Sequence, residues 1–394
     1  MASRRALLGL DWLYFFAADL QTGFGPFIAV YLTDHRWTQA ELGLALGVGS
    51  AAQMLAQVPA GVLVDALHSK AVAAAAALIG ICISAVLLAA WPSFWPVVLA
   101  QTIHGFASCM LNPAMAALTL GLVSGAAVAE RLGRNARFAA IGSAVGAVLL
   151  GACGKFVSTR AVFGVAALLC LPPLLALRSL GRRIDPQPVE EDLTPHEPVS
   201  HVLQDPRLMA YVACTLLFQL SNAAMLPLAA VEITKRADEN ASLIIAACIL
   251  VPQLLVALLS PWAGRAAQLW GRRGVLLVGF CALPLRAVLL AGVTNPFWII
   301  PVQAMDGLGG AVIGVITPLV AADISGHGGR FNLRMGILGL AVGIAATVSN
   351  TAAGAIASSL GSQTAFMGLA LVGIFAVLTV ALAMPETRPR RLPA

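Results

Sequence analysis

Three ionisable side chains stand inside long apolar stretches of the sequence. Asp19, His104 and Asp306 are each surrounded by hydrophobic residues. An ionised group near the middle of a bilayer is costly, so side chains of this kind in such segments point to function. Burial disfavours the charged form of a carboxyl group, and histidine titrates near neutral pH. We therefore interpret these three residues as candidates to take up and release protons.

A fourth charge, Arg286, also lies within an apolar run. An unpaired guanidinium facing lipid would be costly, so we expect Arg286 to turn inward and pair with Asp306. In such a pair Asp306 stays ionised and serves a structural purpose, which leaves Asp19 and His104 as the better proton-coupling candidates. The cysteines are scattered singly, and the sequence predicts no metal site and no disulfide framework.

The elements that must hold these side chains are membrane-spanning helices. The 394-residue chain is 59% hydrophobic and 11% charged, whereas about 25% of a soluble domain is charged. Apolar runs of about 20 residues, long enough to cross a bilayer as helices, recur along the chain. We predict twelve spans, at 7–32, 40–66, 71–90, 94–122, 134–157, 161–180, 207–233, 241–266, 274–293, 296–322, 334–357 and 362–384.

The basic residues indicate how the chain is oriented. With the N-terminus inside, most arginines and lysines fall in segments that face the cytoplasm, which is the positive-inside pattern. An even number of spans then puts both termini in the cytoplasm. The net charge of +6 reflects this topology, and we expect no nucleic-acid partner. The composition, rich in alanine and glycine with arginine favoured over lysine, indicates a multi-pass protein of the bacterial inner (cytoplasmic) membrane.

One polar pattern occurs twice in the chain. The segment RNARFAAIGSAVG, with Asn135 and Arg137, matches FNLRMGILGLAVG, with Asn332 and Arg334 in the same places. A membrane chain built from two similar halves is typical of a secondary transporter, with its site between the halves.

A polar segment rich in proline and charge separates the halves. Its composition argues against a packed core, so we interpret it as a tether. We expect an N-terminal six-helix bundle at 1–180, a cytoplasmic linker at 181–206 and a C-terminal six-helix bundle at 207–394.

Paired loop motifs also stand at equivalent places in the two halves. GVLVDALHSK contains Gly61, Asp65 and Lys70, and GRAAQLWGRR contains Gly264, Arg272 and Arg273. The last apolar run ends in Met-Pro-Glu-Thr-Arg at 384–388. With the repeat and the topology, these motifs make the chain resemble a twelve-helix member of the major facilitator superfamily over nearly its whole length. The resemblance implies an all-α membrane fold of two pseudo-symmetric six-helix bundles.

The resemblance also implies where a substrate would bind. Helices 1, 4, 7 and 10 line the central cavity in that family, and Asp19, His104 and Asp306 fall on three of them. Neutral polar residues on the same helices complete the expected substrate cavity: Gln21, Gln101, Asn112, Gln219, Asn222 and Gln303.

The paired motifs predict a gate at the cytoplasmic side. Asp65 is placed to accept hydrogen bonds from a helix N-terminus and to pair with an arginine of the other half, Arg334 or Arg137. We expect the gate to comprise Gly61, Asp65, Lys70, Arg137, Gly264, Arg272, Arg273 and Arg334.

Two departures limit what the motifs say about coupling. The helix-4 arginine of many proton-driven exporters is Gln101 here, and the glycine-proline pair of helix 5 has no proline. The leading hypothesis is a secondary active transporter that moves a small organic molecule by alternating access with proton-coupled efflux.

An uptake symporter or facilitator is the first alternative, and a transition-metal exporter is the second. No nucleotide-binding loop or nucleophile–base pair appears in the sequence, so we expect no enzyme activity and no cofactor. The expected partners are a small-molecule substrate, protons and the lipid bilayer, and we expect a monomer.

Overall fold

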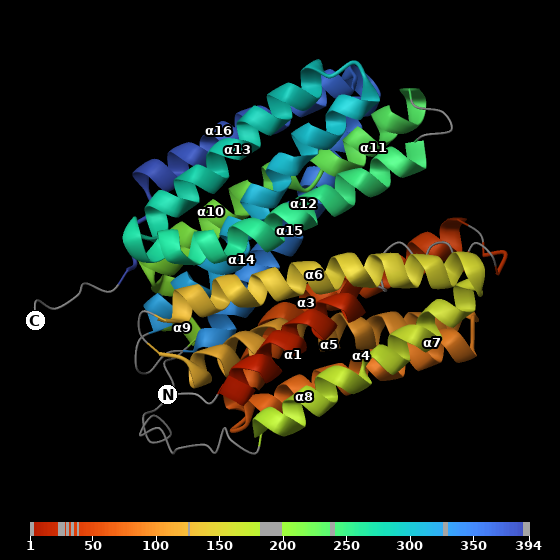
Figure 1. Ribbon diagram of the computed structural model, residues 1–394. Helices are drawn as coiled ribbons and strands as arrows, with labels where there is room; N and C mark the ends of the chain where they lie inside the picture. Colours follow the sequence, from red (N-terminus) through yellow and green to blue (C-terminus); the bar gives the residue numbers. More distant parts are fainter. Residues whose placement is uncertain are drawn as a thin grey trace, which may run out of the picture. The chain divides into compact units, whose positions relative to one another are not determined.

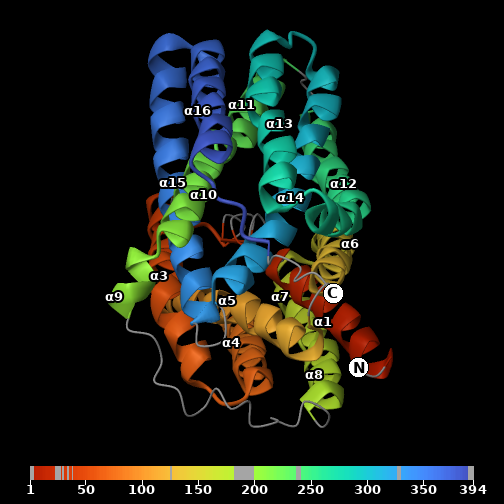
Figure 2. The ribbon, with the colours of Figure 1, turned by 90° about the vertical axis from the view of Figure 1, so that its left-hand side faces the viewer.

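The structure is a computed structural model of the 394-residue chain. It describes residues 4–22, 28, 31–32, 35–37, 39–124, 127–181, 199–236, 241–325 and 330–388. The described regular structure is helical throughout, as Figures 1 and 2 show. The all-helical prediction is therefore confirmed for this part of the chain.

Helices occupy every predicted span within the described residues. Those of the first half of the sequence are α1 (Arg4–Thr22), α3 (Gln39–Ala66), α4 (Lys70–Ala90), α5 (Phe94–Leu122), α6 (Ala127–Phe156), α7 (Thr159–Leu169) and α8 (Leu171–Gly181). Those that follow are α9 (Val199–Gln204), α10 (Pro206–Asn222), α11 (Met225–Arg236), α12 (Ala241–Leu269), α13 (Arg272–Gly292), η3 (Pro296–Trp298), α14 (Ile299–Ser325), α15 (Phe331–Leu360) and α16 (Ser362–Leu382).

Ten segments of the described chain are long and apolar enough to cross a membrane. They coincide with ten of the twelve predicted spans, and α1 and α3 stand at the positions of the other two. The sixth predicted span is divided between α7 and α8, and α8 starts with Leu171 followed by two prolines. Proline lacks a backbone N–H and fits only the first turn of a helix, so the helix begins again there.

The chain divides into two compact units. The first comprises 1–131, 138–195 and 330–337, and the second comprises 132–137, 196–329 and 338–394. The first residues of α15 thus belong to the unit built mainly from the first half of the sequence, and residues 132–137 of α6 belong to the other unit. Within the second unit, α13 and α16 run side by side (Figure 2).

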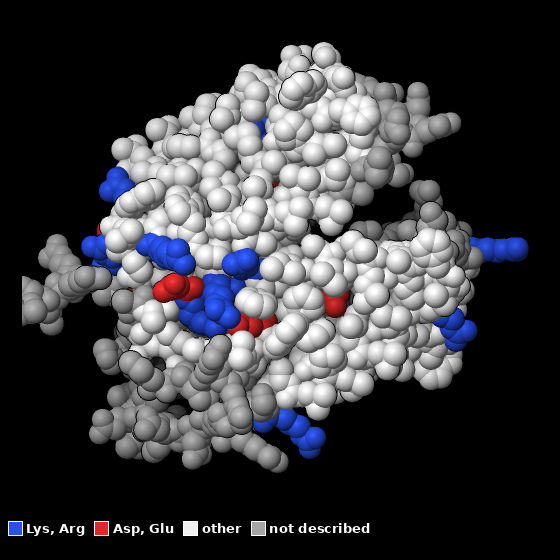
Figure 3. All heavy atoms as spheres, in the orientation of Figure 1, with Lys and Arg blue, Asp and Glu red and all other residues white. Residues whose placement is uncertain are grey.

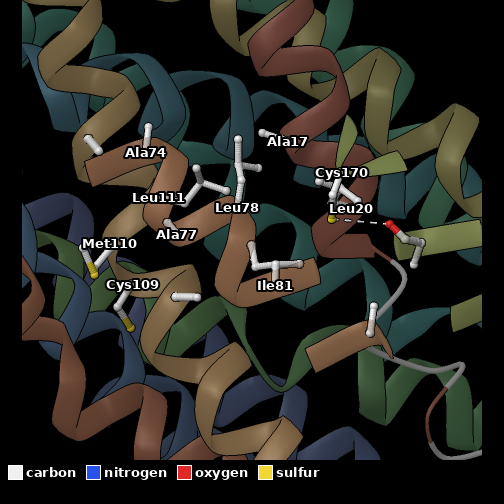
Figure 4. Packing of buried hydrophobic residues seen from close by; sticks show 14 of the residues in the cluster. Ala17, Leu20, Ala74, Ala77, Leu78, Ile81, Cys109, Met110, Leu111 and Cys170 are labelled. Atoms are coloured by element: carbon white, nitrogen blue, oxygen red, sulfur yellow. Dashed lines mark hydrogen bonds between the residues drawn. The ribbon is translucent and has the colours of Figure 1, made fainter. Parts of the chain in front are cut away.

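The core of the first unit is made mainly of aliphatic and small residues from α1, α3, α4, α5, α7 and α8. Figure 4 shows Ala17 and Leu20 of α1 in the same buried cluster as Leu78 and Ile81 of α4. Small residues let helices approach closely in an apolar environment where no hydrophobic force distinguishes protein from lipid. Ala17 and Leu20 flank Asp19, so this packing holds the part of α1 that carries Asp19 in place.

Both units contain the same tyrosine–threonine contact. The hydroxyl groups of Tyr14 on α1 and Thr119 on α5 lie 3.2 Å apart, and those of Tyr211 on α10 and Thr317 on α14 lie 2.9 Å apart. The first pair joins α1 to α5 and the second joins α10 to α14, the corresponding helices of the two halves. The repeat in the sequence is therefore a repeat of structure as well.

Charge is sparse on the outer surfaces of the helices. Figure 3 shows broad uncharged surfaces over α13 and α16, while many of the lysines and arginines on this face gather near the helix ends. This distribution is expected when the middle of each helix faces lipid.

Candidate functional site

Asp19 lies on α1 and is enclosed by the first unit. The residue is 1% exposed, and its Oδ1 atom is buried without a hydrogen-bond partner in the described part of the chain. A buried carboxylate without partners is strongly disfavoured in its charged form. The surroundings of Asp19 therefore favour a bound proton or another positive charge.

The helix that covers Asp19 is α6, and it does so with its backbone. A Cβ atom on Gly146 would overlap Asp19 Oδ1 and would lie 3.1 Å from Asp19 Cα. One turn earlier, a Cβ on Gly142 would overlap the carbonyl oxygen of Phe15. The hydroxyl of Ser143 donates a 3.5 Å hydrogen bond to the carbonyl of Ala18. The glycine pair therefore lets α1 and α6 touch along residues 15–19.

Arg286 forms the centre of a polar cluster in the second unit. Its Nη1 atom donates to Asp306 Oδ1 at 2.5 Å and to Asn222 Oδ1 at 2.6 Å, and its Nε atom donates to Gln303 Oε1 at 2.8 Å. The Arg286 side chain is 2% exposed, whereas that of Asp306 is 31% exposed. The expected inward turn of Arg286 and its pairing with Asp306 are both present.

The cluster joins residues that the sequence assigned to separate roles. Asn222 and Gln303 were expected to line a substrate cavity, and Asp306 was expected to couple protons. Here α10, α13 and α14 bring all three to one guanidinium. Gln303 is fully buried, and its Nε2 atom has no hydrogen-bond partner among the described residues.

The other predicted cavity residues are dispersed over several helices. His104 is half-buried on α5, and its Nε2 atom lies 3.2 Å from the hydroxyl of Ser108. Gln101 is buried against Gly49 of α3, whereas Asn112 is exposed. Gln219 is half-buried on α10. Gln21 lies in the last turn of α1, and its side chain lies outside the described part of the structure.

A buried ion pair between α1 and α6 was missed by the sequence analysis. Arg131 Nη2 donates to Asp11 Oδ1 at 2.7 Å and to the carbonyl of Leu7 at 2.9 Å. The predicted span at 134–157 left Arg131 outside the helix, but α6 begins at Ala127. The signal that could have found the pair is the spacing of Asp11 and Asp19, two turns apart along α1.

Asp65 binds the beginning of α15 within the first unit. Its Oδ1 atom accepts hydrogen bonds from the backbone N–H of Asn332 at 3.1 Å and from the Asn332 side chain at 2.6 Å. Its Oδ2 atom accepts from the backbone N–H of Leu333 at 2.8 Å. A carboxylate at this position satisfies free N–H groups of the first turn and interacts favourably with the helix dipole.

Glycines bring the two helices of this contact together. A Cβ on Gly61 would overlap the carbonyl oxygen of Asn332, and a Cβ on Gly336 would overlap that of Gln57. Gln57, Gly61 and Asp65 are spaced four residues apart and so lie on one face of α3. This face packs against the start of α15.

The basic residues of the predicted gate have distinct positions. Lys70 Nζ donates to the carbonyls of Val64, Asp65 and Leu67, so it caps the end of α3. Arg137 is exposed on α6, and Arg334 is 2% exposed on α15. The Asp65 carboxylate accepts its hydrogen bonds from backbone and side-chain amide groups of α15.

The second copy of the loop motif, which ends in Arg272 and Arg273, is bound by the segment at 384–388. The carboxylate of Glu386 accepts hydrogen bonds from the backbone N–H of Arg272 at 2.9 Å and of Arg273 at 3.2 Å. The Arg272 guanidinium pairs with Asp323 of α14, with Nε 2.9 Å from Oδ2. Gly264 is buried on α12. The segment at 384–388 therefore caps the start of α13.

The described residues contain no group of three or more His, Cys, Asp or Glu side chains placed to hold a metal ion. The arrangement instead offers one enclosed carboxyl group in the first unit and one buried ion pair with amide partners in the second. Such groups within membrane-spanning helices are typical of proteins that carry protons or polar solutes across a membrane. Fold and site thus define a multi-pass membrane transport protein.

The chain belongs to the Major Facilitator Superfamily, whose model matches residues 10–235 and 213–394. The resemblance inferred from the loop motifs is confirmed. An uncharacterized MFS-type transporter of Mycobacterium tuberculosis (strain CDC 1551 / Oshkosh) is 33% identical over 396 residues, covering 97% of this chain and 94% of the relative. The corresponding protein of strain ATCC 25618 / H37Rv matches to the same extent.

A solved structure shares the fold. The crystal structure of FucP, an MFS transporter in the outward conformation, aligns with a TM-score of 0.75 at 13% sequence identity. The alignment covers 96% of this chain and 97% of FucP. The protein is therefore an MFS-type transporter, in agreement with the prediction that it is not an enzyme.

Proposed function

We propose that the protein is a proton-coupled efflux transporter of a small organic molecule in the bacterial inner membrane, with both termini in the cytoplasm. The observation that carries the proposal is Asp19, a carboxyl group that is 1% exposed and whose Oδ1 atom has no hydrogen-bond partner among the described residues. Binding a proton neutralises Asp19 and removes the cost of enclosing it. Releasing the proton makes the enclosed state unfavourable, so protonation and conformation are linked.

The chemistry around Asp19 favours a proton over a metal cation as the coupling ion. A cation such as Ca²⁺ is held by six to eight oxygen ligands, with distances of about 2.3–2.6 Å. The Asp19 carboxylate instead touches the backbone of Gly146, where even a methyl group would overlap it. A proton needs no such space. The metal-exporter alternative also draws no support from the described cysteine, histidine and carboxylate side chains.

Asp306 serves a different purpose in this proposal. Its carboxylate is paired with the buried Arg286, so we assign it and Asn222 to substrate recognition. Both are half-buried and are held on a scaffold of charge-assisted hydrogen bonds. A partly exposed carboxylate beside an amide suits a substrate that carries hydrogen-bond donors or a positive charge.

The direction of transport is tested by accumulation in cells. Cells with and without the protein are loaded with a panel of small organic amphiphiles that includes ethidium, with and without a protonophore. Efflux predicts lower accumulation in expressing cells and loss of the difference with the protonophore. Higher accumulation would reject efflux in favour of uptake.

The role of Asp19 is tested with a matched pair of variants. Asp19→Asn should abolish proton-driven movement of the transported compound in proteoliposomes and retain its exchange, because exchange needs no net proton movement. Glu130→Gln removes an exposed carboxylate from α6 and should leave both activities unchanged. Loss of exchange in Asp19→Asn would mean that Asp19 binds substrate or holds the fold.

A further inference from the structure

We propose that Gly146 is a positioning residue for Asp19. Because Gly146 has no side chain, the backbone of α6 forms the wall against which the Asp19 carboxylate rests, and this wall keeps the carboxyl group out of solvent. The inference rests on the proposed function, in which Asp19 carries the coupling proton.

The contact of Gly146 is made with the functional group itself. A Cβ atom at this position would overlap Asp19 Oδ1 and would lie 2.8 Å from Cγ and 3.1 Å from Cα. Real Cβ contacts this short are not tolerated, so an alanine would push the carboxylate or the helix away. Asp19 Oδ1 is the atom that is buried without a partner in the described part of the chain.

Gly142 provides a contrast on the same face of α6. A Cβ atom on Gly142 would overlap the Phe15 carbonyl oxygen and would lie 3.0 Å from Phe15 Cα. Its three nearest neighbours would therefore all be backbone atoms. Gly142 and Gly146 therefore both set the distance between the helices, but only Gly146 touches the carboxyl group. Substituting each glycine separately therefore distinguishes an effect on the carboxyl group from an effect on the helix distance alone.

The other charged groups near α1 have partners of their own or lie elsewhere on their helices. The charged and titratable side chains described on the helices packed against α1 are Glu130, Arg131, Arg134, Arg137, His104, Arg160 and Arg178. Arg131 bonds Asp11, His104 lies beside Ser108, and Arg160 bonds the carbonyls of Ala89 and Ala90. The close approach of Gly146 to the Asp19 carboxylate points to the backbone of α6 as the part of the fold that encloses this group.

Infrared spectroscopy tests the inference without a transport substrate. A carboxyl group gives a C=O stretching band only when protonated, and the band of Asp19 is the one that Asp19→Asn removes. The full-length protein in lipid vesicles is titrated as wild type, Gly146→Ala and Gly142→Ala. We expect Gly146→Ala to shift the loss of the Asp19 band to lower pH by about one pH unit, because a displaced carboxyl group is less enclosed. Gly142→Ala should give a smaller shift, because its Cβ meets the backbone of Phe15 one turn away from the carboxyl group.

A second variant covers the case in which Gly146→Ala does not fold. Asp19→Glu lengthens the side chain so that the carboxyl group passes beyond the Gly146 wall, and its band should show the same acid shift. An unchanged titration in Gly146→Ala or Asp19→Glu, or an equal shift in Gly142→Ala, would overturn the positioning role. If Asp19 titrates as expected but transport proceeds without it, the proposed function fails and the positioning role stands.

Discussion

Arg286 and Asp306 form an ion pair in which the cation is buried and the anion is partly exposed. The side chains are 2% and 31% exposed, and Nη1 lies 2.5 Å from Oδ1. A buried guanidinium without a counter-charge is strongly destabilising, whereas an intact pair and an apolar replacement of both partners are often similar in stability. The buried guanidinium of Arg286 therefore depends on Asp306 as its counter-charge.

We expect Asp306→Ala to destabilise the second unit by about 3–5 kcal/mol, because it leaves Arg286 buried and unpaired. Replacing both residues, as in Arg286→Leu with Asp306→Leu, should restore most of the stability while abolishing substrate recognition. Thermal unfolding of the purified protein in detergent measures both effects. Equal melting temperatures for Asp306→Ala and the wild type would contradict the requirement for a counter-charge.

The carboxylate of Asp65 should protect the first turn of α15 from hydrogen exchange. It accepts bonds from the backbone N–H groups of Asn332 and Leu333, and hydrogen bonds to charged groups contribute about 1.5–3 kcal/mol. Asp65→Ala should therefore speed exchange at these two amides by at least roughly tenfold, since about 1.4 kcal/mol corresponds to a factor of ten. Mass spectrometry of peptides from this segment gives the measurement.

The first turn of α16 provides an internal control for that experiment. It begins at Ser362 in the second unit, where the Ser362 hydroxyl bonds Glu232 instead of Asp65, so its exchange should stay the same. Faster exchange in both helices would indicate general loosening. Unchanged exchange at Asn332 and Leu333 would mean that Asp65 does not hold the helix start.

Much of the fold could be predicted because hydrophobic run length alone identifies a spanning helix. The pairing of Arg286 with Asp306 was also predictable, since a lipid-facing guanidinium is so costly that a nearby carboxylate must accept it. The Asp11–Arg131 pair was not predictable in this way. Arg131 stands at the edge of its apolar run, where a positive charge has the simple interpretation of a cytoplasmic segment.

The enclosure of Asp19 by Gly146 was beyond sequence reasoning for a different reason. Spacing identifies Gly142 and Gly146 as one small-residue face, but it cannot say which helix that face contacts or which glycine meets a side chain. The same limit applied to Glu386. Its motif was recognised at the end of the chain, while the backbone N–H groups that it binds belong to residues more than a hundred positions earlier.

The C-terminal segment at 384–388 should stabilise the loop before α13. Glu386 accepts hydrogen bonds from the backbone N–H groups of Arg272 and Arg273, which are otherwise free at a helix start. Gly271 precedes them with a φ of 86°, and a Cβ there would overlap the Glu386 carboxylate. The cap therefore depends on a glycine that tolerates this backbone conformation and leaves room for the carboxylate.

Because Glu386 is exposed, we expect Glu386→Ala to cost only about 1 kcal/mol, the usual effect of losing a helix cap. Gly271→Ala should cost more, because it strains the backbone at positive φ and also displaces the cap. The two changes act on one contact, so their combined effect should be smaller than the sum of the single effects. Melting temperatures of the two single variants and the double variant provide the test. Strictly additive losses would show that Gly271 and Glu386 act independently, in which case the C-terminal segment would not serve as the cap of α13.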